Sequence, residues 1–196
     1  MRCATLLAAL SLAECLGGCA SSPPTQFYTL EVVPAQRRER QISHAPVQVA
    51  VVHVPPILDR QEIVRGTGSN TVIVSNRHRW AAPMGDMMRR VLTQDLLERL
   101  PANAIMLAEQ PAPAQTSVLT VDILQFQSEA SGQVVLDGSW SLVPAGTETP
   151  ILSRRVHLTE SAGPQDYAMQ AKSMSRAVGQ LADDIATALA EAAPRD

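Results

Sequence analysis

The sequence contains little cysteine, and all of it lies near the N-terminus. The 196 residues include three cysteines, at positions 3, 15 and 19. The chain after Cys19 therefore has no thiol, which excludes an internal disulfide, a thiolate metal site and a cysteine nucleophile there. A domain of this size can bury a stable core without disulfides, so their absence is compatible with export.

Aromatic residues and net charge are also scarce. The chain has two residues each of Phe, Tyr and Trp, so the core must be built mainly from aliphatic side chains and methionine. Sixteen basic and 19 acidic residues give a formal net charge of −3. This balance provides no extended positive surface for a phosphate backbone, and we expect no nucleic-acid partner.

Sequence signatures of catalysis are missing as well. The chain has neither the His-Glu-x-x-His spacing of a zinc helix nor a Gly-x-Ser-x-Gly nucleophile elbow. Asp183 and Asp184 are adjacent on a predicted helix and point about 100° apart, so they do not face one substrate. The four histidines fall in four separate segments, at His44, His53, His78 and His157. We expect no enzyme, no metal site and no cofactor.

The N-terminal segment has the pattern of a lipoprotein signal peptide. Arg2 precedes an apolar run from Ala4 to Ala13, about half the length that a membrane-spanning helix needs. Leu16-Gly17-Gly18-Cys19 follows as a small-residue cleavage site. We predict that residues 1–18 are removed and that Cys19 carries two or three acyl chains, because one chain anchors only marginally. An ordinary signal peptide with a coincidental cysteine is the alternative.

The residues after Cys19 predict where the domain sits. Ala20 stands where an aspartate commonly retains Gram-negative lipoproteins in the inner membrane, which favours the outer membrane with the domain facing the periplasm. Residues 19–24 are small and Pro-rich and predict a tether of about six residues, which spans about 20 Å. We therefore expect the folded domain, residues 25–191, to lie close to its membrane.

The remaining pattern predicts one α+β domain. Apolar residues at helical spacing predict two long amphipathic helices, from about Pro83 to Leu100 and from Gln165 to Ala190. The segment from Asn76 to Trp80 is expected to lead into the first of them. Runs rich in β-formers predict strands at 25–33, 47–54, 62–65, 71–75, 105–107, 117–127, 133–143 and 151–159. We expect a mostly antiparallel sheet of about six or seven strands, with the second strand covered on both faces.

Three local patterns allow a functional and a structural interpretation. Gly66-Thr67-Gly68 lacks the third glycine and the helix of a phosphate loop, so a hairpin turn is favoured. The methionines of the first helix follow its apolar stripe, which favours a core role over a soft metal site. The second helix is expected to cover the sheet rather than to form a coiled coil, because the final strands form a meander that needs a cover.

Several runs together resemble one family, the ABC-type transport auxiliary lipoproteins of the PqiC/YmbA group. The resemblance extends from Cys19 to about Leu189, including the strand that ends in Trp140 and the alanine-rich final helix. The matching runs are Cys19 to Pro24, Phe27 to Leu30, Pro55 to Val64, Asn70, and Arg79 to Met84.

The resemblance implies a partner. It implies that the chain docks a membrane-anchored MCE-domain protein that helps to move lipids between the two membranes, and that copies of the chain self-associate as a homo-oligomer. Asp59, Arg60, Arg79 and Trp80 are the candidate partner-binding residues, since Arg and Trp are favoured anchors of interfaces. Alternatively, Asp59 and Arg79 form a structural ion pair while Trp80 packs on the sheet.

Two other functions compete with docking. One is a structural lipoprotein that supports envelope assembly without a transport role. The other is a lipid carrier, which would need an apolar cavity that two helices over one sheet leave little room for.

Overall fold

The computed structural model describes residues 23–36, 42, 46–68, 70–107, 110–163 and 166–192. Residues 1–18 and Cys19 lie outside the described residues, so their predicted roles are not tested by it. In chain order the elements are β1 (Gln26–Tyr28), β2 (Val47–His53), β3 (Glu62–Gly68), β4 (Thr71–Trp80), α2 (Met84–Arg99), β5 (Ile105–Met106), β6 (Ser117–Ser128), β7 (Gln133–Val143), β8 (Leu152–Ser161) and α3 (Tyr167–Glu191).

All eight strands belong to one sheet, organised around β6. One edge of β6 pairs with β7, which pairs with β8, and both pairings are antiparallel, so the predicted meander is confirmed. The other edge of β6 pairs in parallel with β2 and, at Ser128, with β3. β5 is parallel to β2, β1 is parallel to β4, and β3 and β4 form an antiparallel hairpin.

The expectation of a mostly antiparallel sheet of six or seven strands is wrong. The sheet is mixed, with eight strands and four parallel pairings among seven. The parallel pairing of β2 with β6 arises because the chain passes through α2 between these strands, so that β6 runs beside β2 in the same direction. A strand's residue pattern reveals its buried face but not which distant strand becomes its neighbour.

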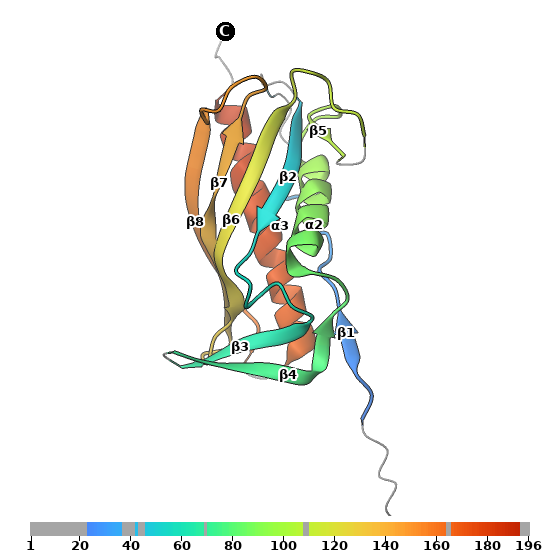
Figure 1. Ribbon diagram of the computed structural model, residues 1–196, viewed down its shortest axis with the longest axis vertical. Coiled ribbons are helices and arrows are strands. Elements are labelled where there is room, and N and C mark those ends of the chain that lie inside the picture. The colour runs from blue at the N-terminus through green and yellow to red at the C-terminus, as the bar shows by residue number, and fades with distance from the viewer. Residues whose placement is uncertain are drawn as a thin grey trace, which may run out of the picture.

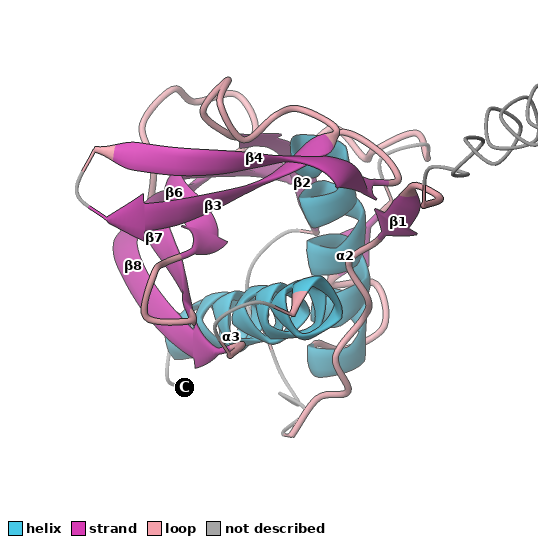
Figure 2. Ribbon diagram, turned by 90° about the horizontal axis from the view of Figure 1, so that it is seen from below, coloured by secondary structure: helices cyan, strands magenta, loops and turns pink. Residues whose placement is uncertain are grey.

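The two helices lie side by side on one face of the sheet, α2 beside β2 and α3 behind β7 and β8 (Figure 1). The helical spacing is confirmed, since the predicted stripe of α2 is wholly buried: Met84, Met87, Met88, Val91, Leu92, Leu96 and Leu100. The methionines are therefore core residues. Seen from below, the hairpin of β3 and β4 crosses one end of the molecule, close to β1 (Figure 2).

The other face of the sheet is open, so the expectation that β2 is covered on both faces is wrong. Ala50 is exposed, and Leu124 on the neighbouring strand is 73% exposed. His53 and His157 lie at the surface on this face, and Nδ1 of His53 lies 2.8 Å from Oδ1 of Asp122. Both helices occupy the opposite face, which leaves this one to solvent.

Two segments differ locally from their predicted structure. The first strand ends at Tyr28, because β1 pairs only with the last three residues of β4. The chain beyond it contacts the helices instead. Residues 76–80, expected to lead into the first helix, continue β4 to Trp80, and α2 begins four residues later.

Candidate functional site

The predicted partner-binding residues lie where β2, β4 and α2 meet. The turn after β2 is closed by the N–H groups of Leu58 and Asp59, which donate to the carbonyl of Pro55 at 2.8 and 3.1 Å. Asp59 is exposed, and its Oδ1 accepts the N–H of Gly85 at 3.5 Å. This carboxylate therefore stands at the positive end of α2, where negative charge is favoured.

Glu62 connects the two arginines of the group. Its carboxylate lies 3.0 Å from Nε of Arg60 and 3.5 Å from Nη2 of Arg79. The Asp59–Arg79 ion pair considered from the sequence is not formed, because Glu62 takes the place of Asp59. A backbone hydrogen bond and the Arg60 side chain hold the pKa of Glu62 below its ordinary value. All three side chains remain more than a quarter exposed, so a partner can reach them.

Trp80 behaves differently from its neighbours. Trp80 is 3% exposed and belongs to the core, and its backbone N–H donates to the carbonyl of Gln61 at 2.6 Å. Trp80 therefore packs inside the fold, as in the structural alternative considered from the sequence. Of the four candidates, Asp59, Arg60 and Arg79 face solvent, while Trp80 supports them from below.

A surface groove of about 470 Å³ adjoins Asp59, between the end of β2 and the start of α2. Its lining includes Val52, His53, Asp86 and Arg89. The groove is mixed in charge and polarity, which suits a protein segment better than a lipid chain.

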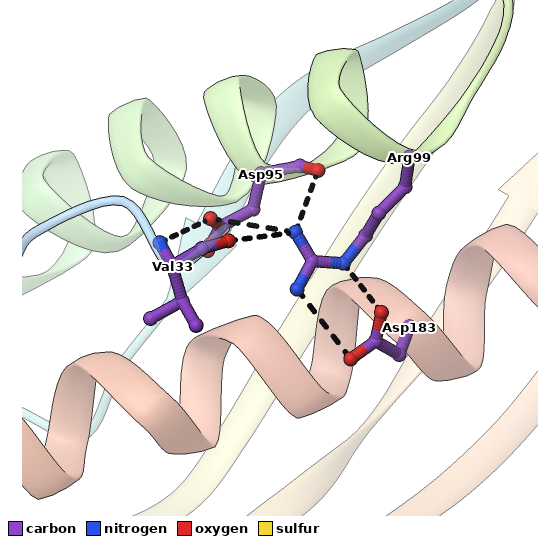
Figure 3. Close-up of polar contacts among 4 residues, drawn as sticks. All are labelled: Val33, Asp95, Arg99 and Asp183. Carbon is purple, nitrogen blue, oxygen red and sulfur yellow. Dashed lines mark hydrogen bonds and ion pairs between the residues drawn. The ribbon is translucent and has the colours of Figure 1, made fainter. Parts of the chain in front are cut away.

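A second arrangement, missed from the sequence, holds the chain that follows β1. Residues 30–33, here called the strap, lie against both helices (Figure 3). The N–H of Glu31 donates to Oγ of Ser175 at 3.1 Å, and the N–H of Val33 donates to Oδ1 of Asp95 at 2.8 Å. A Cβ on Gly179 would lie 2.9 Å from Cβ of Val33, so the strap needs a glycine in α3.

Arg99 connects the strap to both helices, and its side chain is almost fully buried. Nε donates to Oδ1 of Asp183 at 2.6 Å, and Nη1 donates to the carbonyls of Val33 at 3.1 Å and Asp95 at 3.0 Å. We call these groups the Arg99 network (Figure 3). Asp184, the neighbour of Asp183, instead accepts Nε1–H of Trp140 at 2.9 Å. The two aspartates thus have separate structural partners, as their helical spacing predicted.

The Asp95 carboxylate predicts a dependence of stability on pH. Burial raises its pKa from 3.8 to about 6, although the hydrogen bond from Val33 and the charge of Arg99 act in the opposite direction. The negative charges of Asp183 and Glu98 add to the increase. Its Oδ2 is buried and has no hydrogen-bond partner among the residues that the structure describes. Because the folded pKa exceeds the unfolded one, the stability from this group is fully present below about pH 4 and lost as the pH rises through about 6.

Asp95→Asn should abolish this loss, since the amide oxygen can still accept the N–H of Val33. Relative to the variant, the free energy of unfolding of the natural chain should fall by about 2–3 kcal/mol between about pH 4 and pH 7, since each unit of pKa shift corresponds to about 1.4 kcal/mol. Urea denaturation at four pH values measures the difference, and Glu148→Gln on an exposed loop is the control. A difference that stays constant across the pH range would contradict this assignment.

A third cluster joins β1 to the hairpin of β3 and β4 and to α3, and the sequence did not predict it. The hydroxyl of Tyr28 lies 2.9 Å from Nδ1 of His78, and the His78 ring stacks on Tyr167 with centroids 3.9 Å apart. The guanidinium of Arg65 covers the Tyr167 ring at 3.6 Å, while its Nε donates to Gln170 at 2.6 Å. Desolvation lowers the pKa of His78, which favours the neutral ring. Four distant segments supply these residues, so no local spacing signals them.

The described residues hold no group of three or more His, Cys, Asp or Glu side chains placed to bind a metal ion. Within the same part of the chain, neither helix is both long and apolar enough to cross a membrane.

Comparisons with known proteins agree with this architecture. The family model of the ABC-type transport auxiliary lipoprotein component matches residues 28–186. The intermembrane transport lipoproteins PqiC of Escherichia coli K12 and Shigella flexneri are each 28% identical over 129 residues, which cover 65% of this chain and 68% of theirs.

Solved structures share the fold. The crystal structure of an uncharacterized protein superposes with a TM-score of 0.71 at 23% identity, covering 85% of this chain and 99% of the other. The crystal structure of a Xanthomonas campestris protein superposes with a TM-score of 0.66 at 16% identity, covering 83% of this chain and 93% of the other. The family is a transport component and not a class of enzymes. This chain belongs to the ABC-type transport auxiliary lipoprotein component family, to which PqiC also belongs.

Proposed function

We propose that the protein is a non-enzymatic, lipid-anchored auxiliary component of an MCE-type intermembrane lipid-transport system. In this proposal residues 1–18 are the signal peptide, and Cys19 is acylated and holds residues 19–24 as a tether at the outer membrane. The domain then faces the periplasm and docks the MCE-domain protein. The match of residues 28–186 to the transport auxiliary family carries the proposal.

The exposed residues around Glu62 are the surface we assign to the partner. The positive charges of Arg60 and Arg79 lie next to the negative charge of Glu62, and Asp59 lines the groove at the start of α2. Ion pairs this exposed contribute little to folding, so their arrangement is free to serve recognition. Trp80 contributes by holding the end of β4 in place. The space between the sheet and the helices is filled by core side chains, which supports docking over carrying a lipid.

Acylation is tested by Cys19→Ala in the full-length chain. The variant should leave the outer-membrane fraction and appear in the soluble periplasmic fraction, because nothing else in the proposal anchors the domain. Cell fractionation with immunoblotting measures the change, and mass spectrometry of the mature N-terminus identifies the acyl chains. Retention of the variant in the outer membrane would contradict an anchor at Cys19.

Docking is tested by affinity capture of the acylated protein after crosslinking in cells. The natural chain should recover an MCE-domain protein, and Arg60→Glu should recover much less, because it removes a cation from the assigned surface and places like charge against Glu62. Arg155→Glu, on the open face of the sheet, is the matched control. Repeated capture without an MCE-domain protein would contradict docking and favour the role in envelope assembly.

A further inference from the structure

β1 has one face turned into the domain and one turned to solvent. Tyr28 points inward, where its hydroxyl meets His78 and its carbonyl accepts the N–H of Ala81 at 2.8 Å. Successive side chains alternate across a strand, so Phe27 points the opposite way, and it is 61% exposed. Among the chain's six aromatic residues, Phe27 is thus placed on the outside of a strand that is firmly held.

The neighbouring strand places arginines beside this ring. Phe27 pairs with Arg79 in the parallel register of β1 and β4, and paired residues share a face of the sheet. Arg77 lies two residues earlier on β4 and therefore on the same face. Arg77 is exposed and has no acidic partner among the described residues, whereas Arg79 is engaged with Glu62. The outer face of β1 and β4 thus combines an exposed aromatic ring with a free positive charge.

Charge is unevenly distributed around this face. The hairpin from residue 62 to residue 80 holds three arginines and one glutamate, a net charge of +2. The rest of the chain has 13 basic and 18 acidic residues, a net charge of −5. The hairpin is therefore positive in a protein that is otherwise acidic, and it lies at the end of the molecule from which the described N-terminal residues depart (Figure 1).

We propose that the outer face of β1 and β4, with Phe27 and Arg77, lies on the surface of an anionic phospholipid bilayer. Phe27 is the eighth residue after Cys19, which limits the distance between them to about 26–29 Å. An aromatic ring beside an arginine suits the headgroup region, where the ring meets acyl chains and the guanidinium meets phosphates. The proposal rests on the proposed acylation of Cys19, because the tether brings this end of the domain to the membrane.

This contact would hold the docking surface next to the bilayer, because Arg79 lies at the border between the outer face of β4 and the residues around Glu62. The Tyr28–His78–Tyr167 cluster and the strap join β1 rigidly to the hairpin and to both helices. A domain that rests on this face therefore presents its far end, with the β7–β8 connection, away from the lipid (Figure 1).

Fluorescence quenching in reconstituted vesicles tests the orientation. The mature chain has no cysteine after position 19, so a single introduced cysteine can be labelled. Asn76→Cys places an environment-sensitive dye at an exposed position next to Arg77 along β4, from which a flexible linker can reach the edge of the outer face. Thr149→Cys places the dye on the β7–β8 connection. The acylated protein is reconstituted into vesicles of phosphatidylethanolamine and phosphatidylglycerol that contain a headgroup-level spin-labelled lipid. We expect the dye at position 76 to lose most of its fluorescence and the dye at position 149 to lose almost none.

Second-site variants separate contact from tethering. Phe27→Ser and Arg77→Gln, each made in the labelled protein, should restore fluorescence at position 76. Leu124→Ser, which removes an even more exposed apolar side chain from the open face, should not. Melting temperatures within the range of the parent protein exclude unfolding.

Two further outcomes would overturn the proposal. Equal quenching at positions 76 and 149, or unchanged quenching in both Phe27→Ser and Arg77→Gln, would show that this face does not bind the bilayer, and would leave the proposed function intact if mass spectrometry finds the acyl chains. A mature protein without acyl chains would overturn the proposed anchor as well.

Discussion

Arg99→Met is expected to lower the free energy of unfolding by about 3–5 kcal/mol, the cost of breaking a buried ion pair by removing one partner. Methionine can fill much of the space of the arginine stem but donates no hydrogen bond. The substitution leaves the buried carboxylate of Asp95 and the carbonyl of Val33 without their cation. It also breaks the bond of 2.6 Å from α2 to Asp183 in α3.

Urea denaturation of the full mature chain measures this effect. Arg155→Met is the control, because Arg155 is exposed on β8 and substitutions at such surface positions usually change stability by less than about 0.5 kcal/mol. A large fall in the free energy of unfolding in Arg99→Met but not in Arg155→Met would show that the effect depends on the burial of Arg99.

A double variant distinguishes an unpaired charge from lost packing. Asp95→Asn removes the carboxylate that Arg99→Met leaves unpaired, so the two changes together should cost clearly less than the sum of the separate costs. Simple additivity would show that the Arg99 stem contributes by packing and that its charge does not matter.

The sequence predicts the two helices well because each presents a continuous apolar stripe. It does not reveal the Arg99 network, although one signal is visible afterwards. Asp95 and Arg99 lie four residues apart on the side of α2 that also carries Leu92 and Leu96, so a charged pair interrupts a buried face. Charged residues are rarely buried without partners. Their partners, Val33 and Asp183, come from distant segments that no local pattern connects to them.

In the candidate site, too, the sequence predicts local features but not the contacts between distant segments. The turn at Asp59 and Arg60 is located correctly from the sequence, because Pro55 and Pro56 mark the end of β2. The end of β4 is not, since the strand continues to Trp80 and not only to residue 75. Glu62 is missed as the partner of both arginines, since the register of the hairpin decides which side chains meet. The parallel pairings of β2 and β6 are missed for a similar reason, because they join strands more than 60 residues apart.

The second large effect on stability is expected from substitution of Gly138, at the contact between β6 and β7. This glycine lies on β7 between Leu136 and Trp140, all three buried. A Cβ there would fall on the carbonyl oxygen of Asp122, closer than any van der Waals contact, and 3.2 Å from Cα of Ile123. Both atoms belong to the backbone of β6, which cannot rotate away like a side chain. The pairing of the two strands is also irregular between Ile123 and Gln125.

We expect Gly138→Ala to cost about 3 kcal/mol, the upper end of the range for overpacking, because β6 and β7 must separate to admit one methyl group. Ser139→Ala, at the next position on the opposite face, is the matched control and should cost much less. Separation of the strands would also displace Trp140 from its hydrogen bond to Asp184, so Trp fluorescence should change along with the urea midpoint. A stabilised Gly138→Ala variant, as expected where alanine only restricts the unfolded chain, would contradict a close approach of the two strands here.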